Sequence, residues 1–425
     1  MMDEVLGGRT DEESQSFSSF ILSPSFFPRV PLAVPYWSGA TYRSILRCLI
    51  SGHIIDGSEL GKLRSQVIET LGVADAVMCG SGSLALELAL RTCGIRDGDE
   101  VVIPTFCCSA VVPPILAVGA TPVLADVGEE LNLTVETVDP VLTRKTRAII
   151  VPHLFGNPGD IEGIAELAAR KNICVIDDAA QALGATIDGR PVVSFGDLGV
   201  VSFGNEKVCF GLGGGALVFR DNTILQENLS WKLARPSLLQ TLRQLLSVLV
   251  WHRWRRWTTP LSRIHSRRAD PQAVPQPYRG ESLANLNAAV AATLIDSLNE
   301  NIVARRARAR AYQNLLGRDE RLELIAHRAG SACLTQVIEV LPRRRGVDLA
   351  SRVIRALGDA GYEVQGSYVP IHLLGTFREC VWDRLPNSER VWADLIELPC
   401  EPSVDLDDIE RIATIVKKVV NEGQT

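Results

Sequence analysis

The hydrophobic pattern switches between two periods along the chain from about residue 58 onward. Four stretches repeat apolar side chains at helical spacing, and they are 60–71, 84–93, 109–118 and 161–171. Short apolar runs rich in β-branched residues predict buried strands at 100–104, 121–126, 147–152, 172–177, 200–203 and 216–219. Strands that alternate with helices indicate an α/β fold with a mostly parallel sheet flanked by helices.

The same pattern divides the chain into four regions. We expect a flexible leader at 1–30, a large domain at 31–230 and an insertion at 231–275. Residues 276–425 are expected to form a long linking helix over 283–316 and a smaller C-terminal α/β domain. Ligands of parallel sheets lie beyond the carboxyl ends of the strands, so the residues that directly follow each strand are the candidates for chemistry.

Composition and charge exclude several classes of protein. Apolar residues make up 46% of the 425 positions, which is enough to bury a sizeable core without disulfides. The net charge of −6 argues against general nucleic-acid binding. The ten cysteines have no metal-like spacing and most lie in apolar runs, so we expect reduced, buried thiols and no metal site. Acidic residues precede any apolar run and no stretch reaches ~18 apolar residues, so a cytoplasmic location is expected.

Three short motifs carry candidate chemistry. Residues 79–85, Cys-Gly-Ser-Gly-Ser-Leu-Ala, put small residues at a helix start, where backbone N–H groups and hydroxyls can bind a phosphate. Residues 175–181, Val-Ile-Asp-Asp-Ala-Ala-Gln, end an apolar strand with two carboxylates, one of which can meet a protonated ring nitrogen. In 202–215, Lys207 stands in a loop of small residues between two strands, where it can form a Schiff base.

Each motif also has an ordinary structural explanation. The first can be a turn in which Ser83 caps the helix, the second an aspartate that caps the next helix, and the third a solvated loop lysine. Together they supply a phosphate site, a carboxylate for a ring nitrogen and a lysine for an aldehyde. This combination is what pyridoxal 5′-phosphate requires.

Further runs point to one family. They include His-Leu-Phe-Gly-Asn-Pro-Gly-Asp at 153–160, Asp-Asp-Ala-Ala-Gln-Ala-Leu-Gly at 177–184, Ser-Phe-Gly-Asp at 194–197 and Leu-Pro-Cys at 398–400. With these runs, residues from about 31 to 425 resemble the sugar aminotransferases of the DegT/DnrJ/EryC1/StrS family. The resemblance implies the fold type I (aspartate aminotransferase-like) architecture, with a mostly parallel seven-stranded sheet, pyridoxal phosphate as cofactor and a homodimer.

The resemblance also implies roles for matching residues. Lys207 is expected to form the Schiff base and Asp178 to bond the pyridine nitrogen, and both are expected to be catalytic. Gln181 is expected to lie against the ring. His372 resembles a residue of a substrate-side loop, and a purely structural role for it stays open. The expected cofactor-binding set is Gly82, Ser83, Leu84, Cys108, Asp178, Gln181, Ser202 and Lys207, with Gly82, Ser83 and Ser202 at the phosphate.

The chain departs from the family pattern at three places. Cys108 stands where an aromatic residue often stacks on the cofactor ring, so either Phe106 shifts in or another group covers the ring face. Residues 277–282, Pro-Tyr-Arg-Gly-Glu-Ser, replace the usual Tyr-x-Tyr-Arg run, so no phosphate ligand from the partner subunit is carried over. Asn205 and Glu206 replace the usual proline and threonine before the lysine, and we expect Glu206 to face solvent.

A basic segment interrupts this pattern. Residues 231–268 contain nine Lys or Arg, no Asp or Glu, and four of the seven tryptophans, and leucines at 238–249 have helical spacing. One interpretation is a peripheral membrane contact through 238–258 at the inner membrane face. Others are a diphosphate site built from arginines, and a helical insertion that packs on the partner subunit.

The expected activity is transfer of an amino group from an amino acid, glutamate or glutamine, to a nucleotide-linked keto sugar. This reaction would serve cell-surface polysaccharide or secondary-metabolite biosynthesis. The alternatives are a lyase or dehydratase, or a cyclitol aminotransferase, of the same family, and a non-catalytic regulatory member. Dependence on an amino donor separates a transaminase from a lyase, and retention of Lys207, Asp178 and Gln181 argues against a non-catalytic protein.

Overall fold

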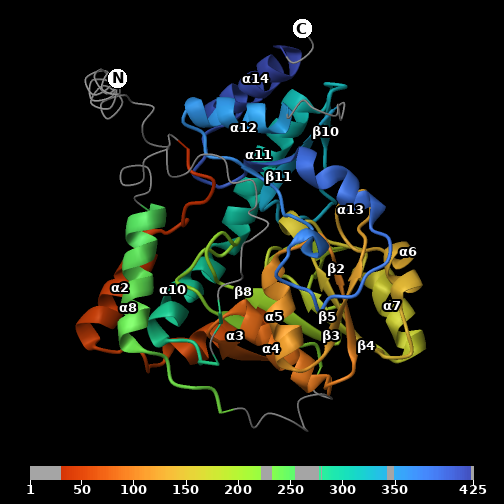
Figure 1. Ribbon diagram of the computed structural model, residues 1–425. Helices are drawn as coiled ribbons and strands as arrows, with labels where there is room; N and C mark the ends of the chain where they lie inside the picture. The colour runs from red at the N-terminus through yellow and green to blue at the C-terminus, as the bar shows by residue number, and fades with distance from the viewer. Residues whose placement is uncertain (1–29, 222–231, 254–276, 279, 342–348, 423–425) are drawn as a thin grey trace, which may run out of the picture.

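The computed structural model describes residues 30–221, 232–253, 277–278, 280–341 and 349–422 (Figure 1). The expected leader at 1–30 therefore lies almost entirely outside the described residues, as do 254–276 of the basic segment.

A seven-stranded sheet forms the centre of the large domain, in the order β1-β9-β8-β5-β4-β2-β3. β9 runs antiparallel to β1 and β8, and the remaining neighbours pair in parallel. The strands are β1 (Asp75–Cys79), β2 (Glu100–Pro104), β3 (Thr121–Ala125), β4 (Thr146–Pro152), β5 (Cys174–Asp178), β8 (Leu198–Ser202) and β9 (Gly215–Phe219). The mostly parallel seven-stranded sheet is therefore confirmed. β1 is a strand that the hydrophobic pattern did not indicate.

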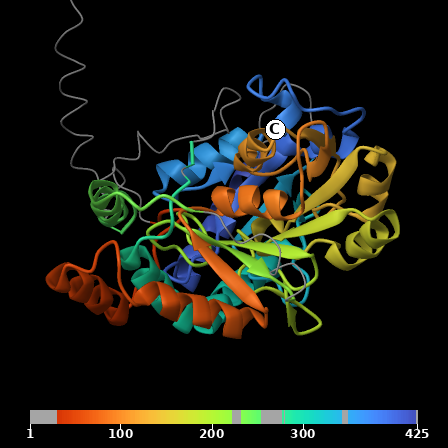
Figure 2. The ribbon, with the colours of Figure 1, turned by 90° about the horizontal axis from the view of Figure 1, so that it is seen from below.

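Helices cover both faces of this sheet (Figures 1 and 2). They are α3 (Glu59–Leu71), α4 (Gly82–Thr92), α5 (Val112–Ala117), α6 (Val135–Val138), α7 (Ile161–Lys171) and α10 (Asn285–Asp296), and α2 (Gly39–Ser51) packs against α10 at the edge of the molecule. The expected helix at 109–118 begins as the 3-10 turn η2 (Ser109–Val111) before α5, which has proline in its first turn. Shorter elements are η3 (Asp139–Val141), η4 (Leu154–Gly156), β6 (Thr186–Ile187) and β7 (Arg190–Pro191).

The single long helix expected over 283–316 is wrong, because two helices stand there. α10 ends before Ser297, and α11 (Leu298–Leu316) begins after it. The Ser297 hydroxyl donates to the carbonyl oxygens of Thr293 and Leu294 at 3.2 and 3.4 Å, and its ψ of 10° leaves the helical range. A serine that bonds to its own helix in this way favours a bend.

The small domain contains an antiparallel sheet in the order β10-β11-β13-β12. Its strands are β10 (Leu322–Leu324), β11 (Thr335–Val340), β12 (Gln365–Gly366) and β13 (Leu395–Pro399). Helices α12 (Leu349–Asp359) and α14 (Leu406–Glu422) lie at the upper end of the molecule, above α11 (Figure 1). Shorter elements are η7 (Ile371–Leu373), α13 (Pro386–Val391) and η8 (Trp392–Asp394). The smaller C-terminal α/β domain is thus present.

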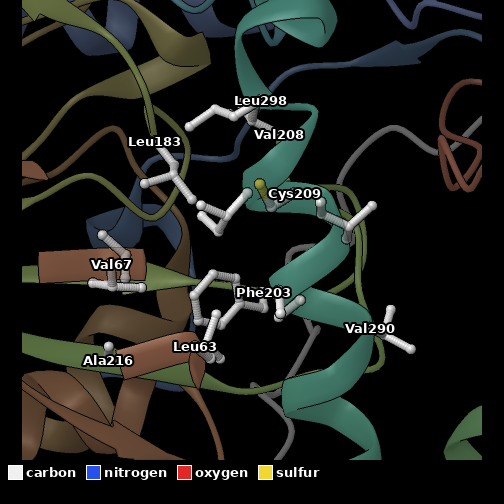
Figure 3. Packing of buried hydrophobic residues seen from close by; sticks show 14 of the residues in the cluster. Leu63, Val67, Leu183, Phe203, Val208, Cys209, Ala216, Val290 and Leu298 are labelled. Atoms are coloured by element: carbon white, nitrogen blue, oxygen red, sulfur yellow. The ribbon is translucent and has the colours of Figure 1, made fainter. Parts of the chain in front are cut away.

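The main core lies between the sheet and α10 and anchors the loop after β8. Phe203, Val208 and Cys209 are at most 2% exposed and flank Lys207 in the chain. Figure 3 shows Phe203, Val208 and Cys209 beside the ribbon of α10 and α11, with Val290 and Leu298 near them. Close packing on both sides of the lysine holds the loop in one place.

The expectation of reduced cysteines is wrong for one pair. Cys93, which ends α4, and Cys174, which begins β5, form a disulfide. The two residues lie in neighbouring elements although they are 81 positions apart, so sequence spacing did not indicate the pair. The other eight cysteines are free, and seven of these are buried.

The described part of the basic segment forms α8 (Leu238–Ser247) and a π-helical turn, η5 (Val248–Arg253). The expected helix is present at the edge of the molecule (Figures 1 and 2). Thr241, Leu245 and Val248 face the protein, whereas Leu239 and Leu246 are 67% and 61% exposed. Within the described residues, the structure contains no helix that is long and apolar enough to cross a membrane.

Candidate active site

A cavity of about 940 Å³ opens at the carboxyl ends of the central strands, between the two domains. It brings together residues that the sequence places more than 300 positions apart. Large-domain lining residues include Ser81, Gly82, Ser83, Cys108, Asp178, Gln181, Ser202 and Lys207. Small-domain lining residues include Thr335, Gln365, Ser367, Tyr368, Glu397 and Glu401.

The start of α4 forms one end of the cavity. Ser81, and not Ser83, caps this helix, because its Oγ accepts from the N–H of Leu84 at 3.1 Å. The hydroxyl of Ser83 instead donates to the carbonyl of Ala110 at 3.3 Å. A Cβ on Gly82 would lie 3.2 Å from the Cβ of Ser202, so glycine permits β8 to approach the helix end closely. Free N–H groups at a helix N-terminus and nearby hydroxyls form a site suited to a phosphate.

Lys207 lies on the loop that joins β8 to β9. The carbonyl of Phe203 accepts from the N–H groups of Gly211 and Gly213 at 3.2 and 3.1 Å, which closes the loop on itself. Asn301 of α11 donates to the carbonyl of Val208 at 3.1 Å. The loop thus holds a half-buried lysine at the cavity wall.

Glu206 is exposed, and within the described residues no ion pair joins it to Lys207. Its φ of 60° places it in the left-handed region, which is uncommon for residues other than glycine. The expectation that Glu206 faces solvent agrees with this exposure.

The two carboxylates that end β5 point to opposite sides, as successive strand residues do. Asp177 is fully buried, accepts from the Nε2 of His153 at 2.6 Å and lies away from the cavity. Asp178 lines the cavity, is 5% exposed, and accepts one bond from the N–H of Ala180 at 2.9 Å. Burial raises the pKa of Asp178, while the Ala180 N–H and the positive charge of Lys207 lower it.

Gln181 is held in a hydrogen-bonded chain that crosses the domain boundary. Its Oε1 accepts from the N–H of Phe155 at 2.9 Å, and its Nε2 donates to the hydroxyl of Tyr368 at 2.8 Å. The ring of Tyr368 stacks on that of Phe155, with centroids 6.0 Å apart. Tyr368 lines the cavity, so the small domain contributes an aromatic side chain to it.

Cys108 lines the cavity as a half-buried thiol. Phe106 does not shift in to replace the missing aromatic residue, because it is fully buried against Phe155 and Tyr368. Of the two possibilities left open for the ring face, the structure therefore favours cover by another group.

Leu84 and His372 lie outside the cavity lining. The side chain of Leu84 packs in the core and its N–H is bonded to Ser81. His372 lies behind the cavity wall, where its Nδ1 is 2.7 Å from the hydroxyl of Thr105 and its Nε2 is 3.2 Å from Glu389. Neither side chain reaches the cavity in this structure.

The residues by which the small domain lines the cavity, called here the small-domain wall, were not anticipated from the sequence. Thr335, Gln365, Glu397 and Glu401 lie on or beside strands of the small sheet, far from the motifs in the chain. One signal was available, because Glu397 interrupts the apolar run Leu-Ile-Glu-Leu-Pro at 395–399. A carboxylate inside a buried strand requires a partner or a function.

The fold and the site define a class of enzyme. A lysine, a buried carboxylate and a helix N-terminus meet at the carboxyl edge of a doubly wound sheet. This arrangement suits an enzyme that holds a phosphorylated, nitrogen-containing aldehyde.

Comparisons with known proteins agree with this class. A model of the DegT/DnrJ/EryC1/StrS aminotransferase family matches residues 39–417. The chain is 30% identical over 378 residues to UDP-N-acetyl-3-dehydro-alpha-D-glucosamine 3-aminotransferase of Acidithiobacillus ferrooxidans, covering 88% of this chain and 92% of that protein. It is 26% identical over 401 residues to GDP-perosamine synthase of Caulobacter vibrioides, covering 93% and 100%. The aminotransferase TlmJ from Streptoalloteichus hindustanus has a TM-score of 0.74 at 25% identity, covering 93% and 100%.

The chain therefore belongs to the DegT/DnrJ/EryC1/StrS aminotransferase family, as the resemblance implied. The family is dependent on pyridoxal phosphate, so the cofactor expected from the sequence is confirmed with it. The residues present fit that group. Asp178 is a buried carboxylate without a full ion pair in the described residues, and a protonated ring nitrogen would supply the missing cation. The N-terminus of α4 and Ser202 line the cavity side by side, and they would hold a phosphate there.

Proposed function

We propose that this protein transfers an amino group from an amino acid, glutamate or glutamine, to the keto carbon of a nucleotide-linked sugar. The observation that carries the proposal is the meeting of Lys207 and Asp178 in one cavity with a helix N-terminus. Two relatives, named as an aminotransferase of a UDP-linked sugar and as GDP-perosamine synthase, support the substrate class. Such a reaction would serve the synthesis of cell-surface polysaccharides or secondary metabolites.

The residues of the chain have distinct tasks in this reaction. When bound, pyridoxal phosphate supplies an aldehyde and a protonated ring that withdraws electrons from the reacting carbon. Asp178, which accepts from the Ala180 N–H, would lie at the ring nitrogen, and its negative charge would keep that nitrogen protonated. Lys207 Nζ would be the base that takes the proton from the substrate carbon bearing the amino group, and it would return that proton on the far side of the amino nitrogen, two bonds away. Gln181, whose amide is hydrogen-bonded at both ends, would orient the ring.

A half-reaction tests the proposal. The holoenzyme is mixed with glutamate, glutamine or alanine, and the absorbance of the lysine-bound cofactor is followed. Glutamate or glutamine should abolish this absorbance and yield the matching 2-oxo acid, and a keto sugar should then restore it. Lys207→Ala should lack both the absorbance and the turnover, whereas Lys171→Ala, a change at an exposed lysine outside the cavity, should retain both. Turnover of a sugar without any amino donor would instead identify a lyase.

We also propose a peripheral contact of α8 with an anionic lipid surface. Leu238, Leu239 and Leu246 are 50%, 67% and 61% exposed on this helix. The segment 231–268 that contains α8 has nine basic and no acidic residues, which favours anionic headgroups. A helix with exposed leucines and neighbouring basic residues suits the membrane interface. Burial of the same leucines in a homodimer, which we propose for the enzyme itself, is the competing outcome of the test.

A further inference from the structure

The small-domain wall of the cavity contains two carboxyl groups that the cofactor does not use. Glu397 of β13 is 5% exposed, and Glu401, which follows that strand, is 3% exposed. Both line the cavity that contains Lys207. Because a buried carboxylate is unfavourable without a partner, the partners of each group indicate what it does.

Glu401 has a counter-ion within the protein. Its Oε2 accepts from Arg305 at 2.6 Å, and Arg305 is fully buried. Arg305 also donates to Asn301 at 2.7 Å and to the carbonyl of Leu334 at 2.9 Å, so its guanidinium joins α11 to the small sheet. Glu401 is therefore satisfied by a structural ion pair.

Glu397 has only neutral partners. Its Oε1 accepts from the hydroxyl of Ser367 at 3.0 Å, and its Oε2 accepts from the amide of Gln365 at 3.2 Å. In the described part of the chain no basic side chain lies within ion-pair distance of it. Its two oxygens keep further lone pairs free, since a carboxylate accepts about four hydrogen bonds.

Thr335 provides a second, independent observation. This residue begins β11, lines the same cavity and is 9% exposed. Its hydroxyl Oγ1 is buried and has no hydrogen-bond partner. Thr335 pairs with Pro399, which lies two residues beyond Glu397 on β13. The side chains of Thr335 and Glu397 are therefore on the same face of the sheet. Unsatisfied buried hydroxyls are rare, which points to a ligand group at this position.

The charges of the lining residues indicate the sign of that group. The phosphate site uses the helix end, Asp178 serves the ring nitrogen and Lys207 serves the aldehyde. Among the described lining residues there is no arginine, and the histidine there, His153, is bonded to Asp177. Glu397 remains as a buried acid without a cation among the described residues. The wall therefore favours a positively charged substituent over an anionic one.

We propose that Glu397 and Thr335 form a subsite for a protonated amino substituent on the substrate ring. The ammonium would donate to free lone pairs of the Glu397 carboxylate and to Thr335 Oγ1. The substrate class narrows to amino sugars or aminocyclitols that carry a nitrogen besides the one exchanged. This inference rests on the proposed function, because it places a sugar ring in the same cavity.

Titration calorimetry on the holoenzyme tests the subsite with three probes that differ at one ring carbon. UDP-glucosamine, UDP-N-acetylglucosamine and UDP-glucose present an ammonium, an amide N–H and a hydroxyl there. We expect UDP-glucosamine to bind wild-type protein more tightly than UDP-glucose. Glu397→Gln should weaken UDP-glucosamine binding by roughly 10- to 100-fold, the usual range for a charged hydrogen bond, and leave UDP-glucose nearly unchanged.

Two further variants complete this test. Glu323→Gln removes an exposed carboxylate of the same small sheet outside the cavity, and it should change nothing. Thr335→Val removes the unpartnered hydroxyl at nearly constant shape, so it should fold normally and weaken UDP-glucosamine by roughly 3- to 10-fold.

Three results would overturn the inference. An equal loss of binding affinity for all three probes in Glu397→Gln would refute an ammonium site, and so would a loss of affinity confined to a neutral probe. If both variants bind UDP-glucosamine like wild type and still react with glutamate, the subsite fails and the proposed function stands. If wild type reacts with glutamate but binds none of the probes, a UDP-linked acceptor is excluded, and the subsite for a UDP-linked amino sugar is excluded with it.

Discussion

Replacing Glu397 by glutamine should raise the free energy of unfolding relative to wild type, and this gain should be larger at pH 8 than at pH 4.5. Burial raises the pKa of Glu397 from 4.5 to about 7, and the hydrogen bonds from Gln365 and Ser367 lower it only in part. In the unfolded chain the same carboxyl ionises near its ordinary pKa. The folded state therefore retains a proton that the unfolded state has already lost.

The sign and size of the effect follow from proton linkage. Between pH 4.5 and 7 the folded state binds more protons, so the free energy of unfolding falls as the pH rises, and it levels off above 7. A shift of this size at about 1.4 kcal/mol per pH unit amounts to roughly 3 kcal/mol. Glutamine cannot ionise, so Glu397→Gln should remove this contribution.

Urea unfolding at half-unit steps from pH 4.5 to 8.5, at one protomer and cofactor concentration, measures this difference. The variant's advantage over wild type should grow by about 3 kcal/mol across the range and then become constant. Glu323→Gln, at the exposed position on β10, should give a curve parallel to wild type. Parallel curves for Glu397→Gln would show that its carboxyl is solvated in the folded protein and would refute the reasoning.

Three further changes probe other parts of the structure. Gly82→Ala places a Cβ 3.2 Å from that of Ser202 and should weaken pyridoxal phosphate binding by roughly tenfold. Equilibrium titration of the apoenzyme with the cofactor measures this loss. The control Gly61→Ala, at a position with open space around it, should bind the cofactor like wild type. Asp178→Asn should retain the lysine-bound absorbance but slow the glutamate half-reaction by roughly 100-fold or more, since a neutral amide cannot keep the ring nitrogen protonated; an unchanged rate would exclude that role. Leu239→Ser with Leu246→Ser should abolish co-sedimentation with anionic vesicles, whereas Leu46→Ser on α2 should not, and a shift from dimer to monomer without any vesicle effect would favour the subunit interface.

Much of the large domain could be predicted from sequence because its strands are buried on both faces. The expected strands at 100–104, 121–126 and 147–152 lie within a residue or so of β2, β3 and β4. A parallel sheet covered by helices needs near-continuous apolar runs, and such runs are conspicuous. β1 has the sequence Asp-Ala-Val-Met-Cys, and both Asp75 and Val77 are only half-buried, so this strand lacks that contrast.

The cofactor side of the cavity could also be anticipated, because its residues come directly after strands. Asp178 ends β5, Ser202 ends β8 and Lys207 follows five positions later. In a motif of this kind, the position of each residue relative to the end of its strand already indicates where the side chain lies. By contrast, Ser81 was overlooked as the helix cap, since the choice between two serines depends on which one has extended backbone.

The substrate side could not be predicted in the same way. Thr335 and Glu397 come together only through the pairing of β11 with β13, and Gln365 joins them through β12. Register between strands that are far apart in sequence is set by the whole hydrophobic pattern and not by a motif. The break at Ser297 similarly depends on a hydroxyl that bonds to its own helix, which the apolar repeat does not record.

Identification of the modified lysine tests the central claim most directly. The holoenzyme is reduced with borohydride, digested and analysed by peptide mass spectrometry, with Lys171→Ala and Lys207→Ala in parallel. The pyridoxyl mass should be found on the peptide that contains Lys207, in wild type and in Lys171→Ala, and it should be absent from Lys207→Ala. A pyridoxyl group on another lysine of the wild-type protein, or none on the Lys207 peptide of a fully loaded sample, would contradict the assignment of this cavity as the active site.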